Sequence, residues 1–126
     1  MMLHRSEVRP GLVLFMNPTI LFEQGVVAEG VGQPIDTPHY FICISVESHR
    51  SSWISASSHN GPCRLPVVRK SGHPGWVGRP TFAVPFHRWT TAFEALVRAS
   101  EGLDLSLPGL RNLAALDWTP PMAVAA

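Results

Sequence analysis

The decisive stretch of this sequence is Thr37-Pro38-His39-Tyr40-Phe41-Ile42-Cys43-Ile44-Ser45-Val46. Its residues alternate as in a β-strand, where successive side chains point to opposite faces. One face carries only apolar and aromatic residues, namely Tyr40, Ile42, Ile44 and Val46. The other face is mixed, with Phe41, Cys43 and Ser45. This pattern predicts a central strand of a small sheet or barrel.

The first residues of this stretch place a histidine at the strand's mouth. Pro38 has no backbone N–H, so it can begin a strand but cannot lie in the middle of one. His39 is therefore expected at the rim of the sheet, where an imidazole can meet a ligand. The same position is also an ordinary one for a half-exposed histidine.

Short strands are expected on both sides of this stretch. Twelve prolines and ten glycines in 126 residues favour many turns over a helical bundle. Leu12–Met16 is a clear strand stopped by Asn17-Pro18, and a polar turn is expected at Glu47–Ser52. Asn60-Gly61 is the strongest turn signal. Further strands are predicted at 20–22, 26–29, 53–56, 65–69 and 81–84. Strands at roughly ten-residue intervals indicate a small β-barrel or sandwich.

The pattern becomes helical towards the C-terminus. Thr91 and Glu94 have capping-box spacing, which predicts a helix over Thr91–Ser100 that Gly102 ends. Its buried stripe would hold Trp89, Phe93, Leu96 and Val97. A second short helix is expected near Pro108–Leu116. The chain is thus predicted to be a single mainly β domain, with a barrel and its terminal helix over 1–102 and a helical extension and tail over 103–126.

Charge is unevenly distributed along the chain. All nine acidic residues lie outside residues 48–93. That window holds six basic residues that are candidates for nucleic-acid binding, namely Arg50, Arg64, Arg69, Lys70, Arg79 and Arg88. Such asymmetry can build a positive surface for phosphate. Alternatively, the fold returns the acids to neighbouring positions and no patch forms.

Cysteine usage and hydropathy bear on the compartment. Cys43 and Cys63 are too few for a disulfide framework, so reduced thiols in a cytoplasmic protein are expected. The apolar run 11–16 is too short for a signal peptide, and no segment approaches the length of a membrane span. We expect a soluble protein without membrane contact.

The order of several short stretches resembles the MazF/PemK family of toxin barrels over about residues 9–100. These stretches are Arg9-Pro10-Gly11, Pro38-His39-Tyr40-Phe41-Ile42-Cys43-Ile44-Ser45, Trp53-Ile54-Ser55-Ala56-Ser57-Ser58 and Gly72-His73-Pro74. The resemblance implies a Src-homology-3-like (PemK-like) barrel with a helix at one end, usually a homodimer. It also implies metal-independent cleavage of single-stranded RNA with a cyclic phosphate product, and an antitoxin partner if the chain is a toxin.

Carried over by position, the family's Ser/Thr role would fall to Ser57 or Ser58. The family's pattern has an arginine directly before its proline. Here that arginine is missing, and His39 follows Pro38 instead. A relative that kept the scaffold and lost catalysis would show the same departure.

The residues offer the groups that RNA cleavage through the 2′-hydroxyl requires. A base must remove the 2′-proton, a cation must stabilise the phosphorane, and an acid must protonate the leaving oxygen. His39 and His73 are candidates for base and acid, and Ser58 for orienting a phosphate oxygen. Arg64, Arg69 or Arg79 would hold the phosphate. Alternatively, His73-Pro74-Gly75 is simply a turn, and the serines bond to their own backbone.

Neither a metal nor another cofactor is expected. His59 and Cys63 form one close pair of potential ligands, whereas structural zinc sites show paired ligands at two ends. The aromatic residues at strand positions, Trp53, Trp76, Phe82 and Phe86, either stack on bases or fill the core.

A different class of function is a non-catalytic barrel that binds a protein partner or nucleic acid, such as an accessory protein of a phage or mobile element. Geometry separates the two classes. An enzyme needs His39, Ser57 or Ser58, and an arginine in one concave site. A binding module needs only an exposed basic or apolar patch.

Overall fold

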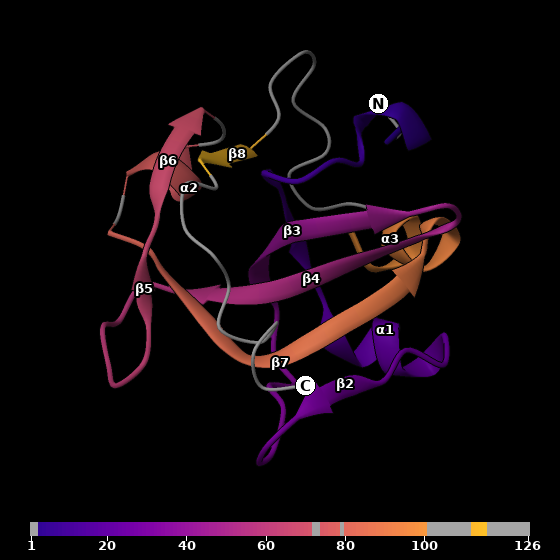
Figure 1. Cartoon of the computed structure of the whole chain (residues 1–126), viewed down its shortest axis with the longest axis horizontal. Coiled ribbons are helices and arrows are strands. Elements are labelled where there is room, and N and C mark those ends of the chain that lie inside the picture. The colour runs from indigo at the N-terminus through magenta and orange to yellow at the C-terminus, as the bar shows by residue number, and fades with distance from the viewer. Residues whose placement is uncertain (1–2, 72–73, 79, 101–111, 116–126) are drawn as a thin grey trace.

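The computed structural model describes residues 3–71, 74–78, 80–100 and 112–115 (Figure 1). Within these residues the chain forms eight strands, three α-helices and one 3-10 turn. In chain order these are η1 (Arg5–Glu7), β1 (Leu12–Met16), α1 (Pro18–Glu23), β2 (Ala28–Gly30), β3 (His39–Glu47), β4 (Arg50–Ser57), β5 (Leu65–Pro66), β6 (Val68–Ser71), α2 (Pro74–Val77), β7 (Phe82–Ala92), α3 (Phe93–Ser100) and β8 (Asn112–Ala115).

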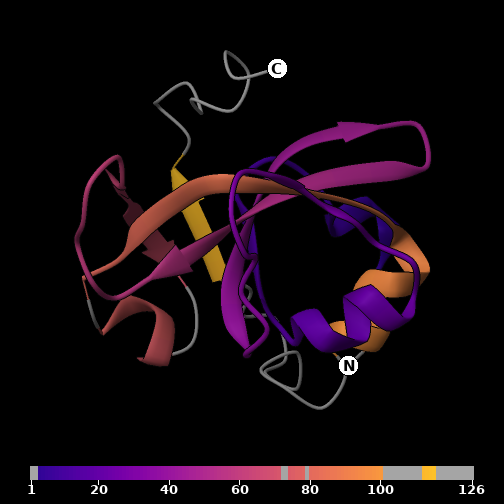
Figure 2. The same cartoon turned by 90° about the horizontal axis from the view of Figure 1, so that it is seen from below.

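The strands form one antiparallel sheet in the order β2-β7-β4-β3-β1-β8-β6, and β5 also pairs with β7. The long strands β3, β4 and β7 lie side by side at its centre (Figure 1). The register shifts between Cys43 and Ser45 and again between Trp53 and Ser55. Such irregularities bend the strands, and the sheet is strongly curved, with α1 and α3 packed together at one side (Figure 2). The mainly β class with a following helix is confirmed.

The decisive stretch is the central strand that its pattern predicts. β3 begins at His39, directly after Pro38, and lies between β4 and β1. Both of its faces are covered by core. Phe41 belongs to a cluster with Trp53 and Trp89, whereas Ile42 packs in a second cluster with Trp76. The sheet therefore separates two apolar layers.

One predicted strand and one predicted turn in the N-terminal half of the chain are wrong. Residues 20–22 lie in the helix α1 rather than in a strand. Asn17 caps this helix by accepting a hydrogen bond from the Thr19 N–H, and Pro18 occupies its first turn, which is a favourable place for proline. The polar turn expected at Glu47–Ser52 is shorter, because Glu47 already pairs with Arg50.

The C-terminal predictions are confirmed for one helix and wrong for the other. α3 begins at Phe93, two residues later than the spacing of Thr91 and Glu94 predicts, because β7 continues to Ala92. The expected helix near Pro108–Leu116 is wrong at Asn112–Ala115, which forms β8 and pairs with β1 and β6. The rest of the predicted extension, 103–111 and 116–126, lies outside the described residues.

In the described part of the chain, none of the helices combines the length and the apolar character that crossing a bilayer requires.

The two cysteines differ in environment. Cys63 is exposed, whereas Cys43 is fully buried within the core cluster that contains Phe41. Burial raises the pKa of the Cys43 thiol to about 12, although a backbone hydrogen bond at Ser45 acts in the opposite direction. The buried thiol therefore stays protonated and unreactive at neutral pH.

This difference predicts an alkaline loss of stability. The unfolded thiol ionises near pH 9 and the folded one near 12, so the stabilisation is complete below pH 9 and is lost as the pH rises towards 12. In this range the free energy of unfolding falls by about 1.4 kcal/mol per pH unit. Urea unfolding between pH 8 and 10.5 should show this extra loss in the parent chain and in Cys63→Ala. It should be missing in Cys43→Ala, and an unchanged slope there would contradict the assignment.

Candidate functional site

A cavity of about 320 Å³ opens where β3 begins and β4 ends. Antiparallel pairing places Tyr40 opposite Ala56, so the next residues outward, His39 and Ser57, meet at the same rim. The cavity is lined by side chains of four kinds, imidazole, hydroxyl, aromatic and small apolar: Phe15, Pro38, His39, Tyr40, Ala56, Ser57, Ser58, His59 and Thr81. Its size and mixed lining are typical of sites for small ligands or single nucleotides.

His39 is held in one orientation at this rim. Its Nδ1 lies 2.8 Å from the Thr37 carbonyl oxygen and 3.4 Å from the Thr37 hydroxyl. A carbonyl oxygen can only accept, so in the neutral imidazole Nδ1 carries the hydrogen and Nε2 is left as the acceptor. The half-buried ring thus presents a proton acceptor, as a general base requires.

The serines and the following histidine form a second group of cavity residues at the end of β4. Ser57 Oγ accepts hydrogen bonds from the His59 N–H at 3.1 Å and from Arg64 Nη1 at 3.2 Å. With its oxygen accepting twice, the Ser57 hydroxyl can donate its hydrogen to a ligand oxygen. Ser58 Oγ lies 3.3 Å from His59 Nδ1.

Arg64 brings a positive charge to this wall. Its Nη1 also donates to the His59 carbonyl at 2.7 Å, so two bonds fix the guanidinium beside the cavity. Within the described residues both bonds use Nη1, so the hydrogens of Nη2 remain to be donated to an anion. Because Gly61 has no side chain, the guanidinium of Arg64 can pack against it. A Cβ at Gly61 would lie 3.3 Å from Arg64 Nε.

Aromatic packing makes the floor of the cavity rigid. The Tyr40 ring contacts Phe15 edge to face at a centroid distance of 4.9 Å and Trp76 at 5.1 Å. Trp76 is itself anchored, because its indole N–H donates to the Leu113 carbonyl at 3.1 Å. Phe15 and Tyr40 are half-buried cavity residues, whereas Trp53 and Trp76 are core.

The structure brings together His39, Ser57 and Ser58, with Arg64 beside them. It does not bring the other described basic residues to the cavity. Arg69 donates to the Val77 carbonyl, and Lys70 is exposed on β6. Arg50 and Arg88 stand in register with acidic residues, Glu47 and Glu29 respectively, and neither arginine lines the cavity. His73 and Arg79 lie outside the described residues.

Sequence reasoning did not assign a catalytic role to His59 or a cavity position to Phe15, Tyr40 and Thr81. The sequence pairs His59 with Cys63 as potential metal ligands. The signal that could have found it is the Asn60-Gly61 turn directly after it, which keeps the loop beside the end of β4. No group of three or more His, Cys, Asp or Glu side chains that could hold a metal occurs among the residues that the structure describes.

Comparison of the chain with family models, with curated proteins and with solved structures gives no match.

Proposed function

We propose that this protein binds single-stranded RNA in the β3–β4 cavity and cleaves it without a metal ion. The observation that carries the proposal is that His39, Ser57 and His59 line one concave site, with Arg64 bonded to Ser57 and His59 beside it. A base, a cation, hydrogen-bond donors and a second imidazole are the groups that attack by a 2′-hydroxyl needs. The cavity volume suits one nucleotide with its phosphate rather than a duplex.

Each group has a role in this scheme. His39 Nε2 removes the proton of the 2′-hydroxyl, whose oxygen attacks the adjacent phosphorus. Arg64 and the Ser57 hydroxyl stabilise the negative charge of the phosphorane. The bond to the 5′-oxygen then breaks, and protonated His59, oriented by Ser58, supplies a proton to that oxygen. The products are a 2′,3′-cyclic phosphate and a 5′-hydroxyl end.

The proposal includes a small barrel of the Src-homology-3 type, similar to MazF/PemK toxins, with a homodimer and an antitoxin as expected partners. The barrel is supported by two strand pairings: β5 pairs with β7, and β6 pairs with β8. Only Val67 separates β5 from β6. In this scheme His39 replaces the family's missing arginine as base, and Arg64 supplies the positive charge from a different loop.

A second candidate is a non-catalytic barrel that binds a protein partner. The observation that favours it is the edge strand β2, which is flanked by exposed Val27 and Val31, with 67% and 90% of their surface accessible. Exposed apolar residues beside a free strand edge are typical of surfaces that add a partner strand.

The deciding experiment incubates the full chain with an end-labelled, unstructured RNA in EDTA, and analyses the product ends. We expect cleavage that survives the chelator and leaves cyclic phosphate. Arg64→Met should lower the rate by about 10²- to 10³-fold, the usual cost of one charge-stabilising donor. Lys70→Met, which removes an exposed cation from β6, should stay within about twofold of the parent.

The other outcomes reject specific parts of the proposal. Cleavage that EDTA abolishes would exclude the metal-independent mechanism. Intact RNA with a salt-sensitive gel shift would leave a binder without catalysis. Neither cleavage nor a shift would reject the nucleic-acid function and favour the protein-binding barrel.

A further inference from the structure

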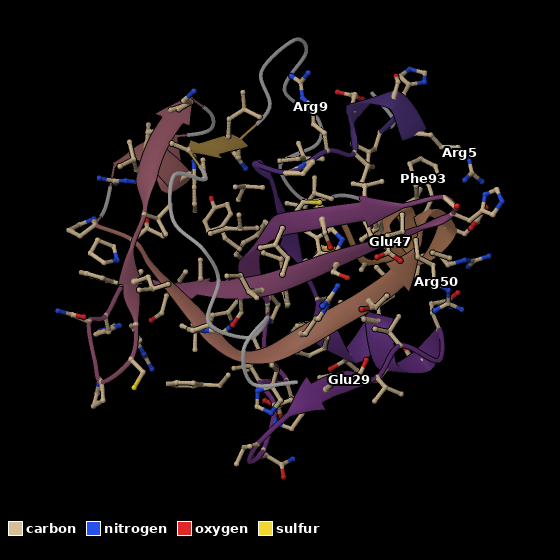
Figure 3. The ribbon with its side chains drawn as sticks, viewed as in Figure 1. Arg5, Arg9, Glu29, Glu47, Arg50 and Phe93 are labelled. Carbon is tan, nitrogen blue, oxygen red and sulfur yellow. The ribbon has the colours of Figure 1, made fainter. Side chains whose placement is uncertain are left out.

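A second pocket lies at the opposite end of the β3–β4 hairpin from the cavity. It has a volume of about 80 Å³ and lies between η1, the hairpin turn and α3. Side chains that matter for its chemistry are Arg5, His49, Arg50, Ser51, Phe93 and Leu96. Figure 3 shows Arg5, Arg50 and Phe93 gathered at this end of the molecule. The pocket shares no lining residue with the β3–β4 cavity.

All ionisable side chains that line this pocket are basic. Arg5 comes from η1, and His49 and Arg50 are neighbours at the hairpin turn, whereas the nearby acids Glu47 and Glu94 do not line the pocket. Arg5 donates from Nη2 to Glu94 Oε1 at 2.7 Å and stacks over the Phe93 ring at 4.8 Å. The two partners are 60% and 65% exposed, so this pair is weak and leaves Arg5 available to a bound anion.

The carboxyl of Glu94 also responds to the basic side chains at this end of the molecule. The pKa of its carboxyl lies below the usual range, first because it accepts a hydrogen bond from its own backbone N–H. The positive charges of Arg5 and His49 lower the pKa further. The same charges act on any anion that enters the pocket.

A buried donor also lines the pocket. Ser51 is only 4% exposed, and its Oγ accepts a hydrogen bond from the indole N–H of Trp53 at 2.8 Å. Because Trp53 is fully buried, this bond fixes the position of the oxygen. In the described structure the Ser51 hydroxyl hydrogen has no acceptor, so it can be donated to a ligand oxygen in the pocket.

We propose that this pocket binds the phosphate of a small phosphate monoester that carries a compact apolar group. Arg5, His49, Arg50 and Ser51 provide donors from several directions, which suits the oxygens of a phosphate dianion. Phe93 and Leu96 provide the apolar surface for the rest of the ligand. The pocket has a volume of about 80 Å³, compared with about 320 Å³ for the β3–β4 cavity. It therefore suits a phosphate with a compact apolar group rather than the nucleotide assigned to the cavity.

Phenyl phosphate is a suitable probe, titrated into isotopically labelled full chain and followed by two-dimensional amide NMR. Saturable shifts are expected at residues 48–51 and at the Trp53 indole N–H, with a Kd of about 1 mM or tighter. Inorganic phosphate should bind more weakly because it lacks the apolar group, and benzoate more weakly because it carries a single charge. This experiment contains no RNA, so its failure would leave the proposed cleavage untouched.

Matched variants identify the site. Arg50→Gln should weaken phenyl phosphate binding by about tenfold or more, since a charge-assisted contact to phosphate is lost. Arg88→Gln is the control, because Arg88 likewise faces an acid across a strand pair but lies outside the pocket. Equal weakening in both variants, or shifts that do not saturate by about ten times the expected Kd, would overturn the site. Benzoate binding more tightly than phenyl phosphate would overturn the phosphate assignment.

Discussion

Replacing His39 by alanine is expected to lower the rate constant of RNA cleavage by about 10²- to 10⁴-fold, the range that a positioned general base contributes. The Thr37 carbonyl fixes the tautomer that leaves Nε2 as proton acceptor, so the orientation is present before substrate binds. Alanine removes the acceptor and leaves the strand pairing with β1 and β4 in place. Single-turnover rates on one RNA, with the protein in excess, measure the chemical step directly.

His87→Ala is the matched control for this prediction. His87 is also a half-buried imidazole that bonds to a backbone carbonyl, that of Gly32 at 3.0 Å, but it does not line the cavity. It should cleave at the parent rate within about twofold. Equal rates in both variants would remove His39 from the mechanism and point to another base.

The parts of the fold that the sequence predicts are those whose signal is local. Leu12–Met16 forms β1 with the predicted bounds, because an apolar run of this length between two turn signals is usual for a strand and short for a helix. The helix after β7 follows in the same way from its apolar spacing. In contrast, Asn112–Ala115 becomes a strand through pairing with β1 and β6, which lie far away in sequence. Ile20–Phe22 is too short for its period to distinguish strand from helix.

For the candidate site, too, only the residues with a local sequence signal could be predicted. His39 and Ser57 could be predicted to face each other, because an antiparallel hairpin that turns at residues 48–49 places them at the same rim. That turn contains Ser48 at φ +39° in place of the usual Asn-Gly, so the sequence predicts only a longer polar turn over Glu47–Ser52 and not its exact position. Arg64 and His59 join the site through hydrogen bonds within a loop, and no periodic pattern in the sequence encodes such bonds.

Trp53→Ala is expected to lower the free energy of unfolding by about 3–5 kcal/mol, the usual cost of deleting a buried large aromatic side chain. Trp53 is completely buried at the centre of β4, in register with Cys43 on one side and Trp89 on the other. Small domains are stable by only about 5–15 kcal/mol, so this variant should be close to unfolding at 37 °C. Urea unfolding followed by far-ultraviolet circular dichroism measures the change.

Two further variants separate the contributions to this loss. Trp53→Phe keeps most of the aromatic volume but removes the indole N–H that donates to Ser51 Oγ, so it should cost less than Trp53→Ala. Phe86→Ala removes an aromatic ring that is 43% exposed on β7 and should change stability by about 0.5 kcal/mol or less. If Trp53→Ala were as stable as Phe86→Ala, the apolar layer formed by Phe41, Trp53 and Trp89 would not be the one that holds β3, β4 and β7 together. The arrangement of both pockets at the ends of this hairpin would then lack its physical basis, since the same strands position His39 at one end and Ser51 at the other.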